Sequence, residues 1–542
     1  MSSFLLVSLN IEAILAEITI HQRRKKLDEM TKGKGLGDAY AATLSRMKAQ
    51  QRSGSKLGME VSMWISHSER PLHVDELCQA LGVEEGSIDM NIENIPAIET
   101  LLACTLGLVT VEKSSSTVRL IHYTLQKYLS HNHNLFTNPH STIAEVCLTY
   151  LNFRQITSIS PSVRFVSPTP PFLEYASCYW GTHAKREATR SVKALALKLL
   201  DGYDKHISSK MLLLCGLPLC HRPFDRADCP TGFTGLHGAA YLGCVDIIVA
   251  LLEMNKWDVR ATDLNGNTAL TWAALKGHEG AVRILLGHDN ANPNSANNYG
   301  QPPLYFAAES GHEGTVRVLL GRSDVNPDTS DKHNRTPLSR AALNGREGVV
   351  KLLLGRSEVN PNTPDEYGLT PLSKAAWNGH AGVMRVLLER NDVNPNIANT
   401  YRQTPLSLAA ENGHEEAVRM LIERNDVYLD TSNKHGRTPL SLAAWNGHEG
   451  VVKILLGLND VNPNTPGVDG RTPLSFAAEY GHEAVVGILL ERNDVNPNTP
   501  NEDGRTPLWF ATENQHEGVV RMLLERNDVN PNTPDEYIQT PL

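Results

Sequence analysis

The chain has 542 residues, more than one hydrophobic core accommodates, so at least two domains are expected. Its formal charge of −9 is divided unevenly, with +3 in residues 1–228 and −12 in residues 229–542, and an acidic second part argues against a nucleic-acid partner. No apolar stretch is long enough to cross a membrane, so we expect a soluble, cytoplasmic protein. The eight cysteines form no Cys-x-x-Cys metal motif, and we expect reduced thiols and neither a metal nor a cofactor.

The N-terminal part predicts three regions. Residues 1–57 read as helices. Residues 58–135 contain three short helical runs and then alternating apolar residues on both sides of Lys113–Ser116, which is typical of a β-hairpin. Three helices and a hairpin make a winged helix, but DNA readout is disfavoured because the third helix, within 95–106, has no Lys or Arg. Residues 136–228 are predicted to form a helical connector.

Residues 229–542 repeat every 34 residues. The repeat is marked by Thr-Pro-Leu or a near variant, with leucines at Leu236, Leu270, Leu304, Leu338, Leu372, Leu406, Leu440, Leu474, Leu508 and Leu542. A fixed period of this length predicts a stacked array in which each repeat buries its apolar face against its neighbours. The expected fold is therefore mostly α, with nine repeats and a truncated tenth. The stop inside a repeat suggests a fragment or a truncated gene model.

Each repeat predicts a pair of helices. In residues 433–466, Thr438 is suited to cap the first helix, Pro439 to open it and Gly447 to end it in the left-handed conformation. The pattern G-x-T-P-L-x-x-A-A-x-x-G-H resembles the ankyrin repeat. Two substitutions depart from it at the turn glycine, where Asn334 and Arg402 stand. Repeat 6 is the expected irregular one, because it carries Tyr-Leu in place of Asn-Pro.

The whole chain resembles fungal NACHT–ankyrin proteins, a group of NLR-like (STAND-type) signalling NTPases. The resembling segments are 4–9, 69–77, 121–129 and 174–180. The resemblance implies that residues 1–57 are the end of a NACHT module and that the repeats sense a ligand for a nucleotide switch. The P-loop pattern G-x-x-x-x-G-K-[ST] is absent, so no nucleotide binding is expected. The same winged helix accompanies lipase-like domains in some proteins, but no Gly-x-Ser-x-Gly elbow occurs here.

His122 has two interpretations. By motif it matches the winged-helix histidine that touches the nucleotide phosphate in NLR-like proteins, which makes it a possible vestigial nucleotide sensor. The alternative is a histidine that packs beside Tyr123.

A partner is expected on the concave face of the first helices, where otherwise similar repeats differ. The variable positions that follow the Ala pair include Leu343, Trp377, Glu411, Trp445 and Tyr480. Trp377 and Trp445 are predicted to face solvent and to anchor a ligand; the alternative is that each packs on its neighbour. A second series recurs in the protruding loops, or fingers, at Tyr299, His333, Tyr367, Tyr401 and His435. It is either a stack of rings that stiffens the array or a strip that binds a peptide.

The sequence therefore predicts a non-enzymatic protein that recognises a protein or peptide ligand. The alternative is a regulatory fragment that docks onto the NACHT NTPase of a full-length relative.

Overall fold

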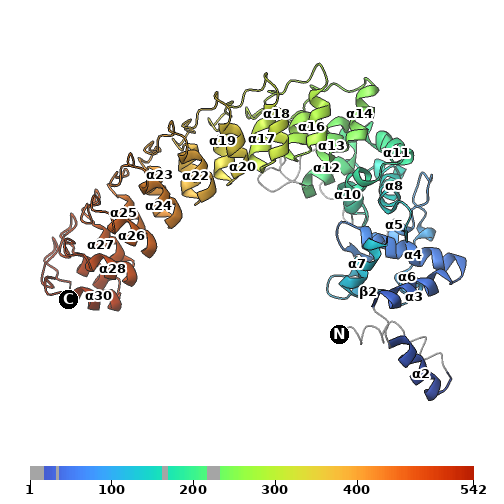
Figure 1. Cartoon of the computed structure of the whole chain (residues 1–542), viewed down its shortest axis with the longest axis horizontal. Coiled ribbons are helices and arrows are strands. Elements are labelled where there is room, and N and C mark those ends of the chain that lie inside the picture. Colours follow the sequence, from blue (N-terminus) through green and yellow to red (C-terminus); the bar gives the residue numbers. More distant parts are fainter. Residues whose placement is uncertain (1–17, 32–35, 133, 162–168, 217–231, 542) are drawn as a thin grey trace. The chain divides into compact units, whose positions relative to one another are not determined.

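The computed structural model describes residues 18–31, 36–132, 134–161, 169–216 and 232–541. The chain divides into two compact units, Met1–Ala273 with Arg283–Ala291 and Ala274–Val282 with Asn292–Leu542, and each is described by itself (Figure 1). Among the described residues, none of the helices combines the length and the apolar character that crossing a membrane requires.

The first compact unit begins with α2 (Ile20–Thr31) and α3 (Leu36–Lys48) and then forms the predicted winged helix. Its helices and strands are α4 (Arg52–His67), β1 (Leu72–His73), α5 (Val74–Leu81), η1 (Ile92–Asn94), α6 (Ile98–Cys104), β2 (Val109–Glu112), β3 (Thr117–Leu120) and α7 (Tyr123–His131). Strands β2 and β3 are the expected antiparallel hairpin, with Val109 opposite Leu120. The two-residue strand β1, which the sequence did not predict, pairs with the other edge of β3 and completes a sheet of order β1-β3-β2.

The described part of the connector, residues 136–161 and 169–216, is helical. It comprises α8 (Pro139–Leu151), α9 (Arg154–Thr157), α10 (Leu173–Arg186), α11 (Arg190–Leu200), η2 (Tyr203–Lys205) and α12 (Ile207–Gly216). Helices α10 and α11 pack against the first repeat, α13 (Gly235–Leu242) and α14 (Val245–Glu253). Gly181 makes this contact close, because a Cβ at this position would lie 2.9 Å from the Leu242 side chain. The connector thus covers the first repeat, which a solenoid would otherwise expose at its end.

The array continues as helix pairs, and Figure 1 shows the pairs from α17 to α30 stacked side by side. The remaining helices are α15 (Ala269–Leu275), α16 (Glu279–Leu286), α17 (Pro303–Ser310), α18 (Glu313–Leu320), α19 (Pro337–Leu343), α20 (Glu347–Leu354), α21 (Pro371–Trp377), α22 (Ala381–Leu388), α23 (Pro405–Glu411), α24 (Glu415–Ile422), α25 (Pro439–Trp445), α26 (Glu449–Leu456), α27 (Pro473–Glu479), α28 (Glu483–Leu490), α29 (Pro507–Glu513) and α30 (Glu517–Leu524). With α13 and α14, the described residues hold nine pairs, which agrees with the nine predicted repeats.

Local sequence explains each pair. The Thr438 side chain accepts a hydrogen bond from the Ser441 backbone N–H at 3.2 Å and so caps α25, while Pro439 occupies its first position. Gly447 ends the helix with φ of +74°. Ala443 is completely buried between neighbouring first helices, which pack on one another along the array. The finger position of Arg402 also has a positive φ, +60°, as the glycine it replaces would adopt.

Histidine side chains join repeats 3 and 5–9 to the repeat that precedes each of them. Nε2 of His414 donates a hydrogen bond of 2.9 Å to the Trp377 carbonyl, at the end of the preceding first helix. The equivalent bonds run from His312, His380, His448, His482 and His516 to the carbonyls of Leu275, Leu343, Glu411, Trp445 and Glu479. In repeat 4, Arg346 replaces the histidine and donates through Nε to the Glu309 carbonyl at 3.3 Å. The carbonyls at these helix ends are therefore satisfied from the next repeat.

Asparagines form a second connection, on the loops that follow the second helices. The Asn464 amide donates to the Asp494 carbonyl at 2.6 Å, and its Oδ1 accepts from the Asn496 backbone N–H at 2.8 Å. The same donor bond to a carbonyl of the following repeat is made by Asn294, Asn362, Asn396 and Asn498. We call this series the asparagine ladder.

Aspartate interrupts the asparagine ladder in repeats 3 and 6, at Asp328 and Asp430. Each still accepts a backbone N–H through Oδ2, at 3.3 Å from Asn360 and 2.9 Å from Asn462. The other oxygen, Oδ1, is buried without a hydrogen-bond partner where asparagine carries its donating amide. Burial raises the pKa of both carboxyl groups. An ionised aspartate therefore fits these positions poorly.

Replacing Asp430 by Asn should stabilise the array by about 1 kcal/mol at pH 7, because the amide can donate where Oδ1 cannot. The pKa of the Asp430 carboxyl is higher in the folded than in the unfolded chain, so this carboxyl destabilises the fold increasingly as pH rises. The gain in free energy of unfolding from Asp430→Asn should therefore be larger at pH 7 than at pH 4. Urea unfolding of the full chain at pH 4 and pH 7 measures this gain. The reverse change in the next repeat, Asn464→Asp, should destabilise most at pH 7. An equal gain at both pH values would contradict the assignment.

Candidate functional site

The predicted partner-binding residues lie at the end of the first helices and in the fingers of the array. We call the surface formed by these two parts the first-helix face. Trp377, the last residue of α21, keeps 45% of its side chain exposed, and Tyr480, directly after α27, keeps 49%. Such exposure is unusual for rings of this size and is available to a partner.

Trp445 differs from Trp377 and corrects part of the prediction, because it is half-buried rather than fully facing solvent. Its ring lies 6.3 Å from Phe476 and 6.2 Å from Tyr480, centroid to centroid, in the next repeat. The guanidinium carbon of Arg437 lies 4.0 Å from the centre of the ring. Trp445 thus packs on its neighbour, the alternative that the sequence left open. Phe476 and Tyr480 offer it aromatic surface, whereas Leu408 and Asn412 hold the equivalent positions beside Trp377.

Two further predicted residues of this face are half-buried. Glu411 accepts a hydrogen bond from the Gln403 amide at 2.5 Å, and burial raises the pKa of its carboxyl group. Leu343 ends α19, and its carbonyl accepts from His380. The same type of inter-repeat bond holds the carbonyls of Trp377, Glu411 and Trp445. The backbone beneath this row of side chains is therefore fixed, a feature that the sequence analysis missed although the recurring Gly-His was visible.

The finger series is exposed, but its rings do not stack. The side chains of Tyr299, Tyr367 and Tyr401 are more than half exposed, and in the described part of the chain no ring contact joins the members of the series. His333 instead pairs with Glu366 at 2.8 Å, and His435 is exposed. The backbone makes the connection: the Tyr367 carbonyl accepts from Thr400 N–H at 2.8 Å, and the carbonyls of Tyr299, His333, Tyr401 and His435 accept from the next finger in the same way.

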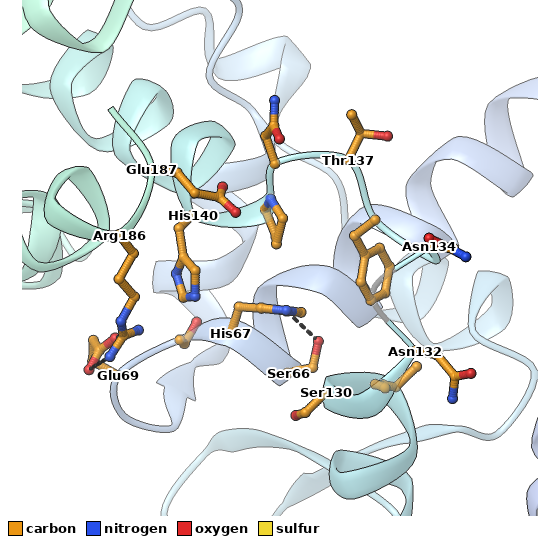
Figure 2. A pocket seen from close by; sticks show the side chains of 15 residues that line it. Ser66, His67, Glu69, Ser130, Asn132, Asn134, Thr137, His140, Arg186 and Glu187 are labelled. Atoms are coloured by element: carbon orange, nitrogen blue, oxygen red, sulfur yellow. Dashed lines mark hydrogen bonds and ion pairs between the residues drawn. The ribbon is translucent and has the colours of Figure 1, made fainter. Parts of the chain in front are cut away.

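The first compact unit contains a separate polar cavity of about 930 Å³ between the winged helix and the connector. Figure 2 shows His67 and His140 on one side of it, with Arg186 directed at Glu69. His140 Nδ1 lies 2.8 Å from His183 Nδ1, and His183 Nε2 lies 3.0 Å from the Tyr175 hydroxyl.

Ser66 and His67, which are neighbours in the wall of this cavity, do not form a nucleophile–base pair. Nδ1 of His67 lies 2.9 Å from the Ser66 hydroxyl and 3.1 Å from the Met63 carbonyl. Because the carbonyl can only accept, Nδ1 carries a hydrogen and has no lone pair to take the Ser66 proton. The Ser66 hydroxyl donates to the Ser62 carbonyl at 2.6 Å. Across the residues that the structure describes, His, Cys, Asp and Glu side chains form no group of three or more that could hold a metal ion.

Burial favours the neutral form of the histidines in and beside this cavity. Desolvation lowers the pKa of His67 and His140, and it lowers the pKa of the fully buried His183 to about 3. The charge of Arg186 acts in the same direction on all three, whereas Glu187 opposes it at His67 and His140.

His122 lies outside this cavity and caps α7. Its Nδ1 accepts a hydrogen bond from the Thr124 backbone N–H at 3.2 Å, and its ring lies 4.5 Å from Tyr123. The described contacts are those of the packing interpretation; a nucleotide-sensing role stays a prediction. The five cysteines for which the structure gives a state are not joined by disulfide bonds; they are Cys78, Cys104, Cys147, Cys178 and Cys244.

Comparison with known families agrees with this architecture. Residues 236–331, 304–399, 391–466 and 458–535 match the family described as ankyrin repeats (3 copies), which together covers more than half of the chain. The chain therefore belongs to the ankyrin-repeat proteins. Residues 44–138 match the winged helix domain of GPI inositol-deacylase. A search of curated proteins found no match.

Trp377→Ala should leave the stability of the array nearly unchanged, within about 0.5 kcal/mol, because the side chain is an exposed surface group. Trp445→Ala should cost about 1–2 kcal/mol, because it removes a ring that packs on Phe476, Tyr480 and Arg437. Urea unfolding of the two single variants, followed by circular dichroism, separates them. Equal losses would contradict the difference in packing.

Acid should destabilise the first compact unit. The folded pKa of His183 lies below the unfolded value of about 6.5, so its favourable contribution is present above that value and is lost as pH falls. At pH 5 one such histidine lowers the free energy of unfolding by about 2 kcal/mol. Thermal unfolding between pH 7 and pH 5 should show this loss, and His183→Gln, which cannot protonate, should show less of it. A pH-independent midpoint in the parent chain would contradict the assignment.

Proposed function

We propose that this protein is a non-enzymatic recognition protein whose first-helix face and fingers bind a protein or peptide ligand. The observation that carries the proposal is Trp377, a large ring left 45% exposed on a helix end whose carbonyl is fixed by His414 of the next repeat. A rigid backbone beneath an exposed aromatic side chain limits the conformational entropy that binding must remove.

The finer proposal is that the array is the sensor part of an NLR-like signalling protein. It is supported by the order of the domains, in which the winged helix matched at residues 44–138 is followed by a helical connector and then by the repeats. The connector covers the first repeat, as a sensor joined to a regulatory domain requires. Docking onto the NACHT NTPase of a full-length relative is the alternative, and it would use the winged-helix region rather than Trp377.

The first test is a selection of random twelve-residue peptides on the immobilised full chain, followed by affinity measurement of the recovered peptides. Trp377→Ala should weaken binding by about tenfold or more, as expected of an interface anchor. The matched control is Tyr428→Ala, which removes an aromatic residue that is 66% exposed and whose backbone N–H is bonded to Asn396 of the asparagine ladder, so it belongs neither to a first-helix end nor to the finger series. It should change affinity by less than about threefold.

Two outcomes would contradict the proposal. One is a selection that enriches no peptide. The other is a set of peptides that respond to Tyr428→Ala as strongly as to Trp377→Ala, which would place the binding surface elsewhere.

A further inference from the structure

Four repeats carry an arginine three residues before the marker leucine, at the base of the finger, and in three of them a carboxylate partners it. Arg335 pairs with Asp331 at 2.6 Å and Arg471 with Glu479 at 2.8 Å. Arg505 lies 3.9 Å from both Glu513 and Asp535. The charge of each of these arginines is therefore balanced within the array.

Arg437, in repeat 7, is the exception among the described residues. The position that holds Asp331 in repeat 4 is Asn433 here, and the position that holds Glu479 in repeat 8 is Trp445. Among the residues that the structure describes, no carboxylate lies within ion-pair distance of Arg437, and its guanidinium makes no hydrogen bond. Its Nε is buried without a hydrogen-bond partner, as are those of Arg471 and Arg505, and the residue as a whole is half-buried.

Aromatic rings hold the Arg437 guanidinium in place. Its central carbon lies 4.0 Å from the Trp445 ring centre and 4.9 Å from that of Phe476. Stacking of this kind orders the planar group and leaves its N–H edge free to bind. Glu411 and Glu479 feel the charge of Arg437, and both are already engaged: Glu411 accepts from Gln403 at 2.5 Å, and Glu479 accepts from Arg471 at 2.8 Å.

We propose that Arg437 is the anchor for a carboxylate of the peptide or protein ligand, an Asp or Glu side chain seated on the guanidinium with a neighbouring apolar residue against Trp445 and Tyr480. This inference rests on the proposed function and specifies the chemistry of its ligand. The guanidinium edge matches a carboxylate in shape and charge, and Tyr480, 49% exposed, supplies apolar surface beside it. The surplus of acidic residues in the array disfavours acidic ligands elsewhere, so a single seated carboxylate also fixes the register of the peptide.

The test uses the peptides selected from the random library on the full chain. They should share an Asp or Glu, and replacing that residue by its amide should weaken binding by about tenfold or more. Arg437→Gln should weaken binding of the acidic peptide by a similar factor but leave the affinity of the amide peptide unchanged. Arg471→Gln, which removes an arginine already paired with Glu479, is the matched control and should change affinity by less than about threefold.

The outcomes separate this inference from the proposed function. Two outcomes would overturn the role of Arg437 while peptide recognition stands. In one, the selected peptides share no acidic residue. In the other, Arg437→Gln weakens binding of the acidic peptide and of its amide equally. A selection that enriches nothing overturns both this inference and the proposed function. If Arg437→Gln unfolds, the affinities of the acidic peptide and its amide for the parent chain still measure how much the peptide carboxylate contributes to binding.

Discussion

The array depends on hydrogen bonds that cross from one repeat to the next. The apolar contact between neighbouring first helices is made largely by alanine pairs, which pack closely and without direction. The bonds from His414, His448 and His482 to carbonyls of the preceding repeat are directional, and they fix where each first helix ends relative to the next. The spacing and orientation of the side chains at these ends follow from that constraint.

The same constraint explains why binding residues can vary without disturbing the fold. The position that follows the Ala pair is leucine, tryptophan or glutamate in successive repeats, yet its backbone carbonyl makes the same bond each time. The fold requires the main chain at this position and leaves the side chain free. Arg346 extends the rule, since an arginine in place of histidine still supplies the donor. A solenoid built in this way separates the residues that stabilise it from those that recognise a ligand.

Much of this architecture could be predicted because its determinants are local. A 34-residue period, a Thr-Pro helix start and a Gly-His helix end specify the helix pairs, and the hairpin around Lys113–Ser116 follows from alternation of apolar residues. The environments of individual side chains could not be predicted in the same way. Trp377 and Trp445 occupy equivalent positions, and only their neighbours in space make one exposed and the other half-buried. The unpaired state of Arg437 likewise depends on what repeats 6, 7 and 8 place around it.

The aspartates in the asparagine ladder have a consequence for the mechanics of the array. A stack of repeats under load yields first where the fewest directional bonds cross a junction. Asp328 and Asp430 lack the amide that donates this bond in the other repeats, and Oδ1 of each is buried without a hydrogen-bond partner. The array therefore contains two junctions, three repeats apart, that are crossed by one directional bond fewer than the others, and Trp377 lies in the segment between them.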